Sequence, residues 1–391
     1  MNPCTTAKEF MMNDVESDSR TSGENARRIL KRDPNPHLFR PLTIRAVTLR
    51  NRIMLSPMCQ YSATDGVAND WHLVHLGARA SGGAGIVFTE AVHTEPKGRI
   101  TKHCLGLWND QQRDVLARIV DFIEDRGAVP AIQLGHAGRK ASVGRPWEGT
   151  GPIGPENGGW PLISSSAQAY AKGFSVPEEM TKDGIEKHIE ELQKSVRRAK
   201  HAGFKILEIH AAHGYLFHQF LSPLSNSRTD EYGGTFENRT RFLLKALDGA
   251  RAEWPSDLPL FVRLSTTDWV EGGWSIEDSV RLCKILESRG DVDLIDCSSG
   301  GNDPRQEIPI HPGYQTGFSQ TIKQSTKLLT ASVGLINSPD LAEAIVANGW
   351  GDLVAMGRTL MSDPHWPLRA ANALKCKPDI WPSQYERSNI F

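Results

Sequence analysis

The chain has 391 residues, and its 45 lysine and arginine residues nearly balance its 46 aspartate and glutamate residues. A nucleic-acid or acidic-membrane partner would favour an excess of basic charge, so neither is expected. Hydrophobic residues make up 39% of the chain, which suits a soluble globular protein, and no apolar run approaches the roughly 20 residues that span a bilayer. The six cysteines include no Cys-x-x-Cys pair, which argues against a disulfide scaffold, a zinc ribbon or an iron–sulfur cluster.

The first part of the chain has the composition of a tail. Residues 1–35 are polar and aperiodic, and they are predicted to be disordered. They lack the apolar core of a secretory signal, and their acidic residues argue against a transit peptide, so a cytoplasmic protein is expected. The basic cluster within residues 27–32 is interpreted as part of this solvated tail, with a targeting patch as the alternative. Residues 36–391 are predicted to form a single domain.

Short apolar runs then alternate with helical patterns. A β-hairpin is predicted first, from Leu42-Thr43-Ile44 and Val47-Thr48-Leu49, which flank a tight bend. The predicted strands that follow centre near Met54, Val87, Ile132, Leu207, Val262, Ile295, Leu329 and Val354. The predicted helices span Asp70–Ala80, Gln111–Asp125, Lys182–Ala202, Asn238–Glu253, Ile276–Ser288 and Pro339–Ala347.

Eight strands that alternate with helices are typical of a (β/α)8 TIM barrel, an α/β fold. The rival doubly wound sheet would place a glycine-rich fingerprint after the first strand, where N-R-I-M-L-S-P-M-C has none. Residues 134–181 are too many for a simple strand–helix turn, so they are predicted to form a lid over the active face. Residues 378–391 are predicted to form a C-terminal tail.

Polar residues and glycines follow several strands, where barrel enzymes place their active sites. Gly334 and Gly357 precede helices whose backbone N–H groups can hold a phosphate, and Arg358 adds positive charge. Gln133 can donate and accept hydrogen bonds at the edge of a pyrimidine-like ring. Arg263 inside an apolar barrel needs an anionic partner, which a phosphate-bearing cofactor that becomes anionic on reduction would provide. Each residue can also be purely structural.

A histidine pair follows the fourth strand. His210 and His213 are three residues apart, and Tyr215 comes two residues later. This spacing favours two donors that converge on a substrate oxygen while a phenol supplies a proton. Two other interpretations stay open: both histidines can be core residues, or they can be metal ligands. No Asp, Glu or Cys in the run obviously completes a metal site, and no metal is expected.

Four long motifs occur in the chain. They are N-R-I-M-L-S-P-M-C-Q-Y (51–61), Q-L-G-H-A-G-R-K (133–140), E-I-H-A-A-H-G-Y-L (208–216) and S-N-S-R-T-D-E-Y-G-G-T-F-E-N-R (225–239). With these motifs, the chain from about Leu38 onward resembles the Old Yellow Enzyme family of FMN-dependent ene-reductases. Within that family it is most similar to the branch of thermophilic-like enzymes and xenobiotic reductases.

The resemblance implies an FMN site at the barrel mouth. It assigns cofactor contacts to Pro57, Met58, Cys59, Ala91, Gln133, Arg263, Gly334, Gly357 and Arg358. The last three would hold the phosphate, and Arg263 would favour the anionic reduced flavin. Cys59 would tune the flavin potential, although a cysteine is more often a small buried hydrophobe.

The resemblance also implies a reaction. NADPH or NADH would reduce FMN, which would then reduce the C=C bond of an α,β-unsaturated carbonyl compound. His210 and His213 would bind the carbonyl oxygen, Tyr215 would supply the proton, and Tyr61 would line the pocket. Arg387 resembles an arginine that enters a neighbouring subunit's site, which implies a homodimer or homotetramer.

Two features differ from related enzymes. Gln60 stands where many relatives carry Met, and the loop around Trp147 is longer than in some members. Both would affect the pocket and lid, not the flavin, so they bear on the substrate. One alternative function is an FMN-dependent desaturase, isomerase or tailoring enzyme that uses the same site. A second is a flavin-free, metal-dependent barrel hydrolase that uses the histidine pair.

Overall fold

A computed structural model describes residues 35–149 and 151–388. The tail predicted for residues 1–35 lies outside these ranges, except for Asn35. The division of the chain into a tail and one domain therefore stays a prediction.

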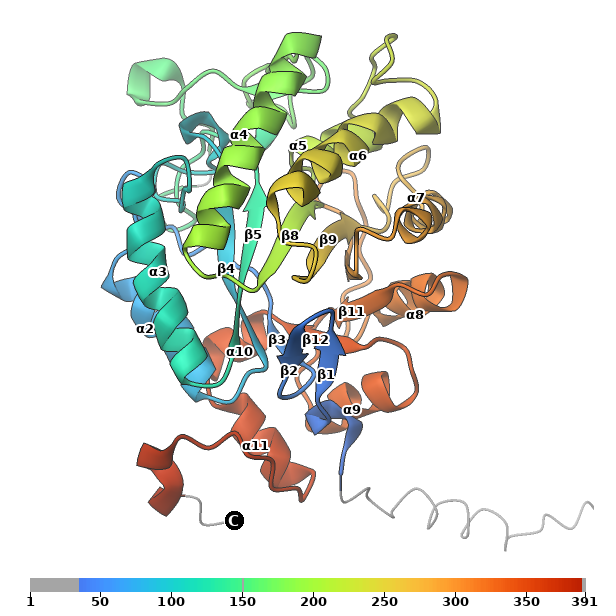
Figure 1. Ribbon diagram of the computed structural model, residues 1–391. Coiled ribbons are helices and arrows are strands. Elements are labelled where there is room, and N and C mark those ends of the chain that lie inside the picture. The colour runs from blue at the N-terminus through green and yellow to red at the C-terminus, as the bar shows by residue number, and fades with distance from the viewer. Residues whose placement is uncertain (1–34, 150, 389–391) are drawn as a thin grey trace, which may run out of the picture. The chain divides into compact units, whose positions relative to one another are not determined.

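In the described part of the chain, eight parallel strands close into a barrel in the order β10-β11-β12-β3-β4-β5-β8-β9. The strands are β3 (Ile53–Leu55), β4 (Ile86–His93), β5 (Val129–Gly135), β8 (Ile206–Ala211), β9 (Leu260–Ser265), β10 (Leu294–Ser298), β11 (Leu329–Val333) and β12 (Leu353–Met356). Each predicted strand centre falls within one of them, and helices surround the strands (Figure 1). The predicted (β/α)8 fold is confirmed.

The larger outer helices are α2 (Asp70–Ser81), α3 (Asp110–Asp125), α4 (Lys182–His201), α6 (Phe236–Glu253), α7 (Ile276–Arg289), α8 (Thr316–Ser325) and α9 (Pro339–Ala347). Most begin at a side chain that accepts a backbone N–H, as Asn109 does for α3 and Ser275 for α7. The prediction missed α8, because its segment T-G-F-S-Q-T-I-K-Q-S is polar and offers only a weak helical pattern. It also missed α5 (Leu216–Leu221) and α11 (Trp366–Ala373), whereas α10 (Arg358–Ser362) follows Gly357, where a helix was expected.

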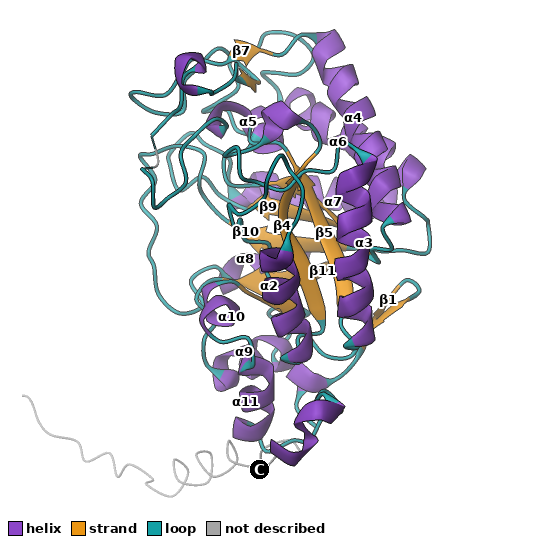
Figure 2. Cartoon of the chain, turned by 90° about the vertical axis from the view of Figure 1, so that its left-hand side faces the viewer, coloured by secondary structure: helices purple, strands orange, loops and turns teal. Residues whose placement is uncertain are grey.

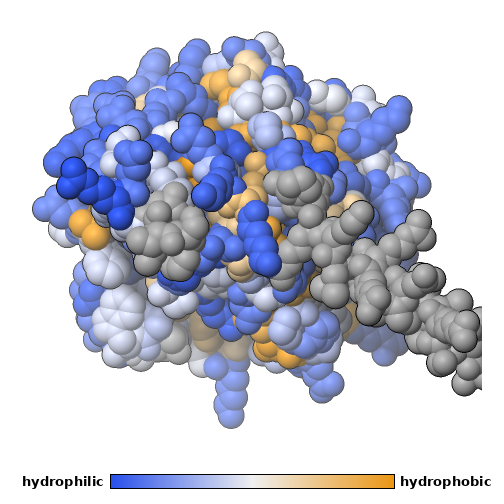
Figure 3. All heavy atoms as spheres, turned by 90° about the horizontal axis from the view of Figure 1, so that it is seen from below, coloured by the Kyte–Doolittle hydropathy of each residue, from blue (hydrophilic) through white to orange (hydrophobic). Residues whose placement is uncertain are grey.

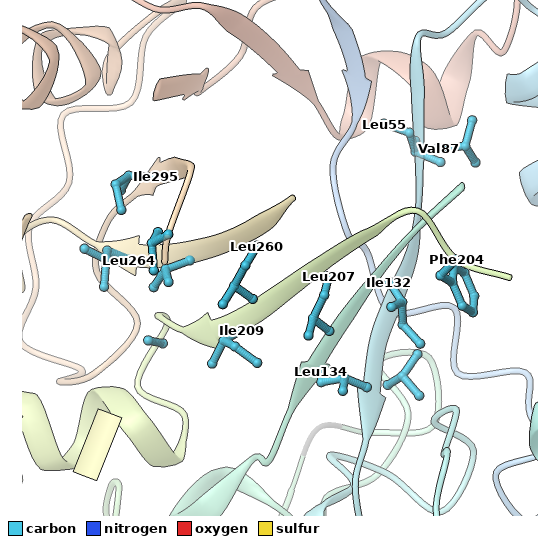
Figure 4. Packing of buried hydrophobic residues seen from close by; sticks show 14 of the residues in the cluster. Leu55, Val87, Ile132, Leu134, Phe204, Leu207, Ile209, Leu260, Leu264 and Ile295 are labelled. Atoms are coloured by element: carbon cyan, nitrogen blue, oxygen red, sulfur yellow. The ribbon is translucent and has the colours of Figure 1, made fainter. Parts of the chain in front are cut away.

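The hydrophobic core has an outer and an inner part. Side chains on the outer face of the strands, such as Leu55, Ile132 and Leu207, pack between the barrel and its helices (Figure 4). Because side chains alternate along a strand, their neighbours fill the barrel interior, where Phe88 and Phe261 lie 6.4 Å apart between ring centroids.

The predicted hairpin is confirmed and closes one end of the barrel. β1 (Leu42–Ile44) pairs antiparallel with β2 (Val47–Leu49). Its apolar residues join the inner cluster, beside the first residues of β4, β8, β10 and β12. The N-terminal end of the barrel is therefore filled, and barrels of this kind bind their ligands at the C-terminal ends of the strands.

The long segment after β5 contains η3 (Gly138–Lys140), η4 (Pro155–Asn157), β6 (Ile163–Ser164) and β7 (Glu178–Glu179). It lies at the top of Figures 1 and 2, and α11 lies at the bottom. Arg228, from the fourth long motif, donates to the carbonyl oxygens of Ser165 and Met180 at 3.1 and 2.7 Å. This motif therefore anchors the second half of the segment, whose role as a lid stays a prediction.

Across the ranges 35–149 and 151–388, no helix is both long enough and apolar enough to cross a bilayer.

Candidate active site

Four polar side chains form the floor of the barrel mouth, on the neighbouring strands β5, β8, β9 and β10. Gln133 Nε2 donates to Glu208 Oε1 at 2.7 Å, and Arg263 Nε lies 3.1 Å from Asp296 Oδ2. Burial, with Asp296 nearby, raises the pKa of Glu208 to about 8, although Arg263 opposes the shift. Glu208 therefore keeps its proton at neutral pH. Burial also raises the pKa of Asp296, although Arg263 opposes the shift.

A cavity of about 260 Å³ opens beside this floor. Its lining includes Arg263, Gly334, Gly357 and Arg358, so two guanidinium groups face one cavity. The φ of +127° at Gly334 is a backbone conformation that strains any residue with a side chain. A Cβ atom at Gly357 would lie 3.0 Å from Met58 Sδ. Bare backbone beside two guanidinium groups suits a phosphate-bearing ligand.

The remaining predicted cofactor residues line the same mouth. Ala91 pairs with Gln133 across β4 and β5, next to a bulge that follows Phe88. Pro57 and Met58 follow β3 and line the cavity. The fold thus places the polar Gln133 and three apolar side chains next to the cationic cavity. Gln133 can contact the polar edge of a flavin ring and the apolar side chains can pack against it, so these residues fit FMN.

Cys59 lies next to Met58 in the chain, and its side chain is partly exposed. A hydrogen bond with Cys104 and burial raise the pKa of the Cys59 thiol. Cys59 is therefore a neutral thiol in this structure, not a reactive thiolate.

His210 and His213 come together at the end of β8. His213 has a φ of +59°, and its backbone N–H donates to Ser265 Oγ at 2.8 Å. Its Nε2 lies 2.6 Å from Ser298 Oγ, and its Nδ1 lies 3.4 Å from His210 Nε2. Burial and the charge of Arg263 hold the pKa of both imidazoles well below the usual histidine range. Both rings are therefore neutral at physiological pH.

Tyr215 completes the predicted catalytic set. Its ring centroid lies 5.0 Å from that of His210, at an interplanar angle of 80°. Burial raises the pKa of Tyr215, so the phenol holds its proton. Tyr61, Cys59 and Tyr215 pack against one buried cluster, formed by Ile100, Cys104, Ala137, Ala141 and Leu162. The Tyr61 ring also meets Trp147 edge-on, at 6.1 Å between centroids.

Arg387 is not brought to the site of its own chain. It is exposed in the C-terminal 3-10 turn, η5 (Ser383–Ser388), whose Tyr385 ring lies 6.0 Å from His365 beside α11. Figure 3 shows the lower face of the molecule, where apolar residues lie between polar ones. Entry of Arg387 into a neighbouring subunit stays a prediction.

Within residues 35–149 and 151–388, no group of three or more potential metal ligands includes His210 or His213. Among the residues that the structure describes, Glu95, His136 and His188 form the one group of three His, Cys, Asp or Glu side chains with metal-ligand spacing. These three lie outside the predicted site set.

Sequence reasoning assigned no role to Lys140 or Ser298. Lys140 ends the second long motif, and its Nζ donates to the carbonyl oxygens of His213 and Gly301 at 2.8 and 2.7 Å. Ser298 contacts His213 from β10. Its place in the second motif was the only feature of the sequence that could have pointed to Lys140. No feature of the neighbouring sequence points to a role for Ser298.

Comparisons with known proteins identify the family of the chain. The family model described as NADH:flavin oxidoreductase / NADH oxidase family matches residues 37–377. An NADPH dehydrogenase of Geobacillus thermodenitrificans is 44% identical over 359 residues, which cover 91% of this chain and 100% of that protein.

Solved structures share the barrel. Morphinone reductase aligns with a TM-score of 0.73 at 28% identity, covering 87% of this chain and 90% of that chain. An Old Yellow Enzyme from a Pichia species shares the fold, with a TM-score of 0.72 at 24% identity, over 87% of this chain and 88% of that chain. The chain therefore belongs to the NADH:flavin oxidoreductase / NADH oxidase family, which includes the Old Yellow Enzymes, and it is an oxidoreductase that uses FMN and a nicotinamide donor.

Proposed function

We propose that this protein is an ene-reductase that reduces the C=C bond of α,β-unsaturated carbonyl compounds. The observation that carries the proposal is the separation of 3.4 Å between His210 Nε2 and His213 Nδ1, beside Tyr215. An oxygen atom can sit about 2.8–3.0 Å from both nitrogens, which is the usual hydrogen-bond distance. Two neutral imidazoles can then each donate one N–H to a single carbonyl oxygen.

The cofactor would be held by two groups of residues. Arg358 and the backbone at Gly334 and Gly357 would bind the phosphate, because they line the cationic cavity. Gln133 and Arg263 would contact the polar edge of the ring. When bound, FMN supplies hydride transfer between the nicotinamide donor and the substrate.

The histidines would activate the substrate. Hydrogen bonds from His210 and His213 withdraw electron density from the β-carbon and stabilise the negative charge that develops on the carbonyl oxygen. Their low pKa values keep both rings neutral, so each ring donates without carrying a charge of its own. The buried setting strengthens these bonds, because little water competes for the oxygen.

Tyr215 would give its proton to the α-carbon. A phenol with a raised pKa holds its proton until a strongly basic carbon forms beside it, which suits a general acid for this step. Tyr61, which packs on the same buried cluster, would line the pocket for the rest of the substrate.

The test compares the holoenzyme with His210→Ala and Tyr215→Phe variants. We expect each variant to retain FMN, measured by its absorption spectrum, and to reduce a cyclic enone with NADPH on the order of 10–1,000-fold more slowly. His201→Ala is the matched control, because His201 is exposed at the end of α4. Unchanged enone turnover in both site variants would refute the assigned roles.

The same assay separates the alternative flavin chemistry. A desaturase would be reduced anaerobically by a saturated ketone and would leave the enone untouched. The protein belongs to a family of flavin oxidoreductases, and this membership argues against the alternative of a metal-dependent hydrolase.

The subunit arrangement has its own test. We propose a homodimer or homotetramer in which Arg387 enters the neighbouring pocket. Deletion of the last six residues should lower the activity. Mixed oligomers of the truncated chain and the His210→Ala chain should recover part of it, because a truncated subunit's intact histidines can pair with a full-length neighbour's Arg387. Absence of recovery in oligomers shown to be mixed would contradict this arrangement.

A further inference from the structure

Lys140 joins three parts of the molecule beside the proposed proton donor. Its Nζ donates to the carbonyl oxygen of His213, in the loop after β8, and to that of Gly301, in the loop after β10. The same Nζ lies 5.2 Å from the ring centroid of Tyr215 and 4.6 Å from that of Tyr170, in the long segment after β5.

The two carbonyl contacts restrain the histidine loop. His213 lies in the left-handed region, with a φ of +59°, where a non-glycine residue needs support from its surroundings. The loops are also in close contact, because a Cβ atom at Gly214 would lie 2.2 Å from the carbonyl oxygen of Gly301. Lys140 binds both loops where they touch. It therefore restrains the positions of His213 and of Tyr215, which follows two residues later.

The position of the amine also matters electrostatically. A cation within about 6 Å of an aromatic centroid is attracted to the ring. When Tyr215 gives up its proton, the ring becomes a phenolate, and attraction to an ammonium at this distance strengthens in a buried site. Burial and Arg139 lower the pKa of Lys140 to about 7. Negative charge on Tyr215 favours the protonated amine again.

We propose that Lys140 is a positioning residue that holds the His213–Tyr215 loop in place and stabilises the negative charge on Tyr215 during proton donation. The proposal rests on the proposed ene-reductase function and assigns a role that the histidines and Tyr215 do not fill. Tyr215 transfers the proton to the α-carbon and is reprotonated from solvent, and Lys140 itself transfers no proton.

Other ionisable groups surround Lys140 and Tyr215. None of them is substituted in the variants compared below. They are Arg139, Tyr170, His210, His213, Cys59, Tyr61, Cys104 and, next to Arg139 and Tyr170, Asp303.

The experiment is a double-mutant cycle on the holoenzyme. Enone reduction by pre-reduced protein is measured for the wild type, Lys140→Met, Tyr215→Phe and the double variant. We expect Lys140→Met to slow this step about 10-fold, and to have a smaller effect in the Tyr215→Phe background, where only the placement of His213 is lost. An equal loss in both backgrounds, or no loss in either, would overturn the proposal.

Two further variants separate charge from structure. Lys140→Arg keeps the cation and should recover part of the rate. Lys172→Met, at an exposed lysine of the same long segment, should behave as the wild type. FMN content and the melting temperature of each variant show whether it is folded.

A readout without turnover keeps the two proposals distinguishable. With a fluorinated tyrosine at position 215, 19F NMR follows its titration, and Lys140→Met should raise its pKa. An unchanged pKa would refute the role of Lys140 even in an active enzyme. Failure of the wild type to reduce enones would instead refute the proposed function, whatever the titration shows.

Discussion

Ser298 Oγ lies 2.6 Å from Nε2 of His213, although the two residues are 85 positions apart in the chain. When the serine hydroxyl donates to Nε2, the proton of the neutral imidazole resides on Nδ1, which faces His210. In that arrangement the serine sets which nitrogen of His213 offers an N–H to a substrate oxygen.

Ser298→Ala should therefore weaken binding of a small phenol and slow enone reduction about 10-fold, because His213 loses its preferred tautomer. The measurement is a phenol titration of the flavin spectrum together with enone turnover. Ser298→Thr keeps the hydroxyl and should retain more activity than the alanine variant. Equal activity in the wild type and Ser298→Ala would contradict this role.

Glu208→Gln should change how stability depends on pH. The folded pKa of Glu208 is raised to about 8, against roughly 4.3 for an unfolded glutamate. Its contribution to stability is fully present below the unfolded pKa and is lost as pH rises through the folded pKa, because only the unfolded chain ionises readily in between.

Between pH 5 and pH 8 the wild type should therefore lose about 2–5 kcal/mol more unfolding free energy than Glu208→Gln. Urea unfolding at saturating FMN measures the difference. The variant keeps the oxygen that accepts from Gln133. Parallel pH profiles for the two proteins would show that Glu208 is ionised in the folded state.

Glu95 links two buried imidazoles from separate elements. Its Oε1 lies 3.3 Å from His188 Nδ1 and 3.5 Å from His136 Nε2. The N–H of Gly138 donates to His136 Nδ1 at 2.9 Å, so the neutral ring carries its proton on Nε2, toward Glu95. Burial raises the pKa of Glu95, but hydrogen bonds from both histidines outweigh it and leave the pKa below its usual range. The proton on His136 Nε2 occupies the position that a metal ion would need, so the contacts of Glu95 favour a hydrogen-bonded cluster over a metal site.

Glu95→Gln should lower the unfolding free energy by about 1–3 kcal/mol at pH 7, because the two imidazoles lose a charged acceptor. Urea denaturation measures the loss, and Glu178→Gln, at an exposed glutamate of β7, is the control. Stabilisation of the wild type by zinc that is lost in Glu95→Gln would instead identify a metal site.

Arg358→Ala should reduce FMN affinity about 10–100-fold, because one of the two cations that line the phosphate-sized cavity is removed. Flavin fluorescence during titration of the apoprotein measures the dissociation constant. The side chain of Arg358 is exposed, so the stability of the apoprotein should change little. Arg118→Ala, at an exposed arginine of α3, is the matched control. Equal affinity in all three proteins would place the phosphate elsewhere.

Much of the architecture was predictable from the chain alone. Parallel strands buried on both faces appear as short apolar runs, so all barrel strands could be located. The long motifs around Cys59, Gln133 and His210 identified the family and its cofactor. The helix α8 was missed because its few apolar residues, Phe318 and Ile322, do not set up a clear period.

The contacts between side chains that are far apart in the chain could not be predicted from the sequence. Hydrophobic periodicity and capping are local properties of a segment, so the amino-acid sequence by itself determined the strands, most outer helices and the residue types at the strand ends. The contacts of Ser298 with His213, Gln133 with Glu208, and Lys140 with two loops depend on the register of a closed barrel. Only the tertiary structure decided them, because ring closure brings together residues that are 73 to 161 positions apart.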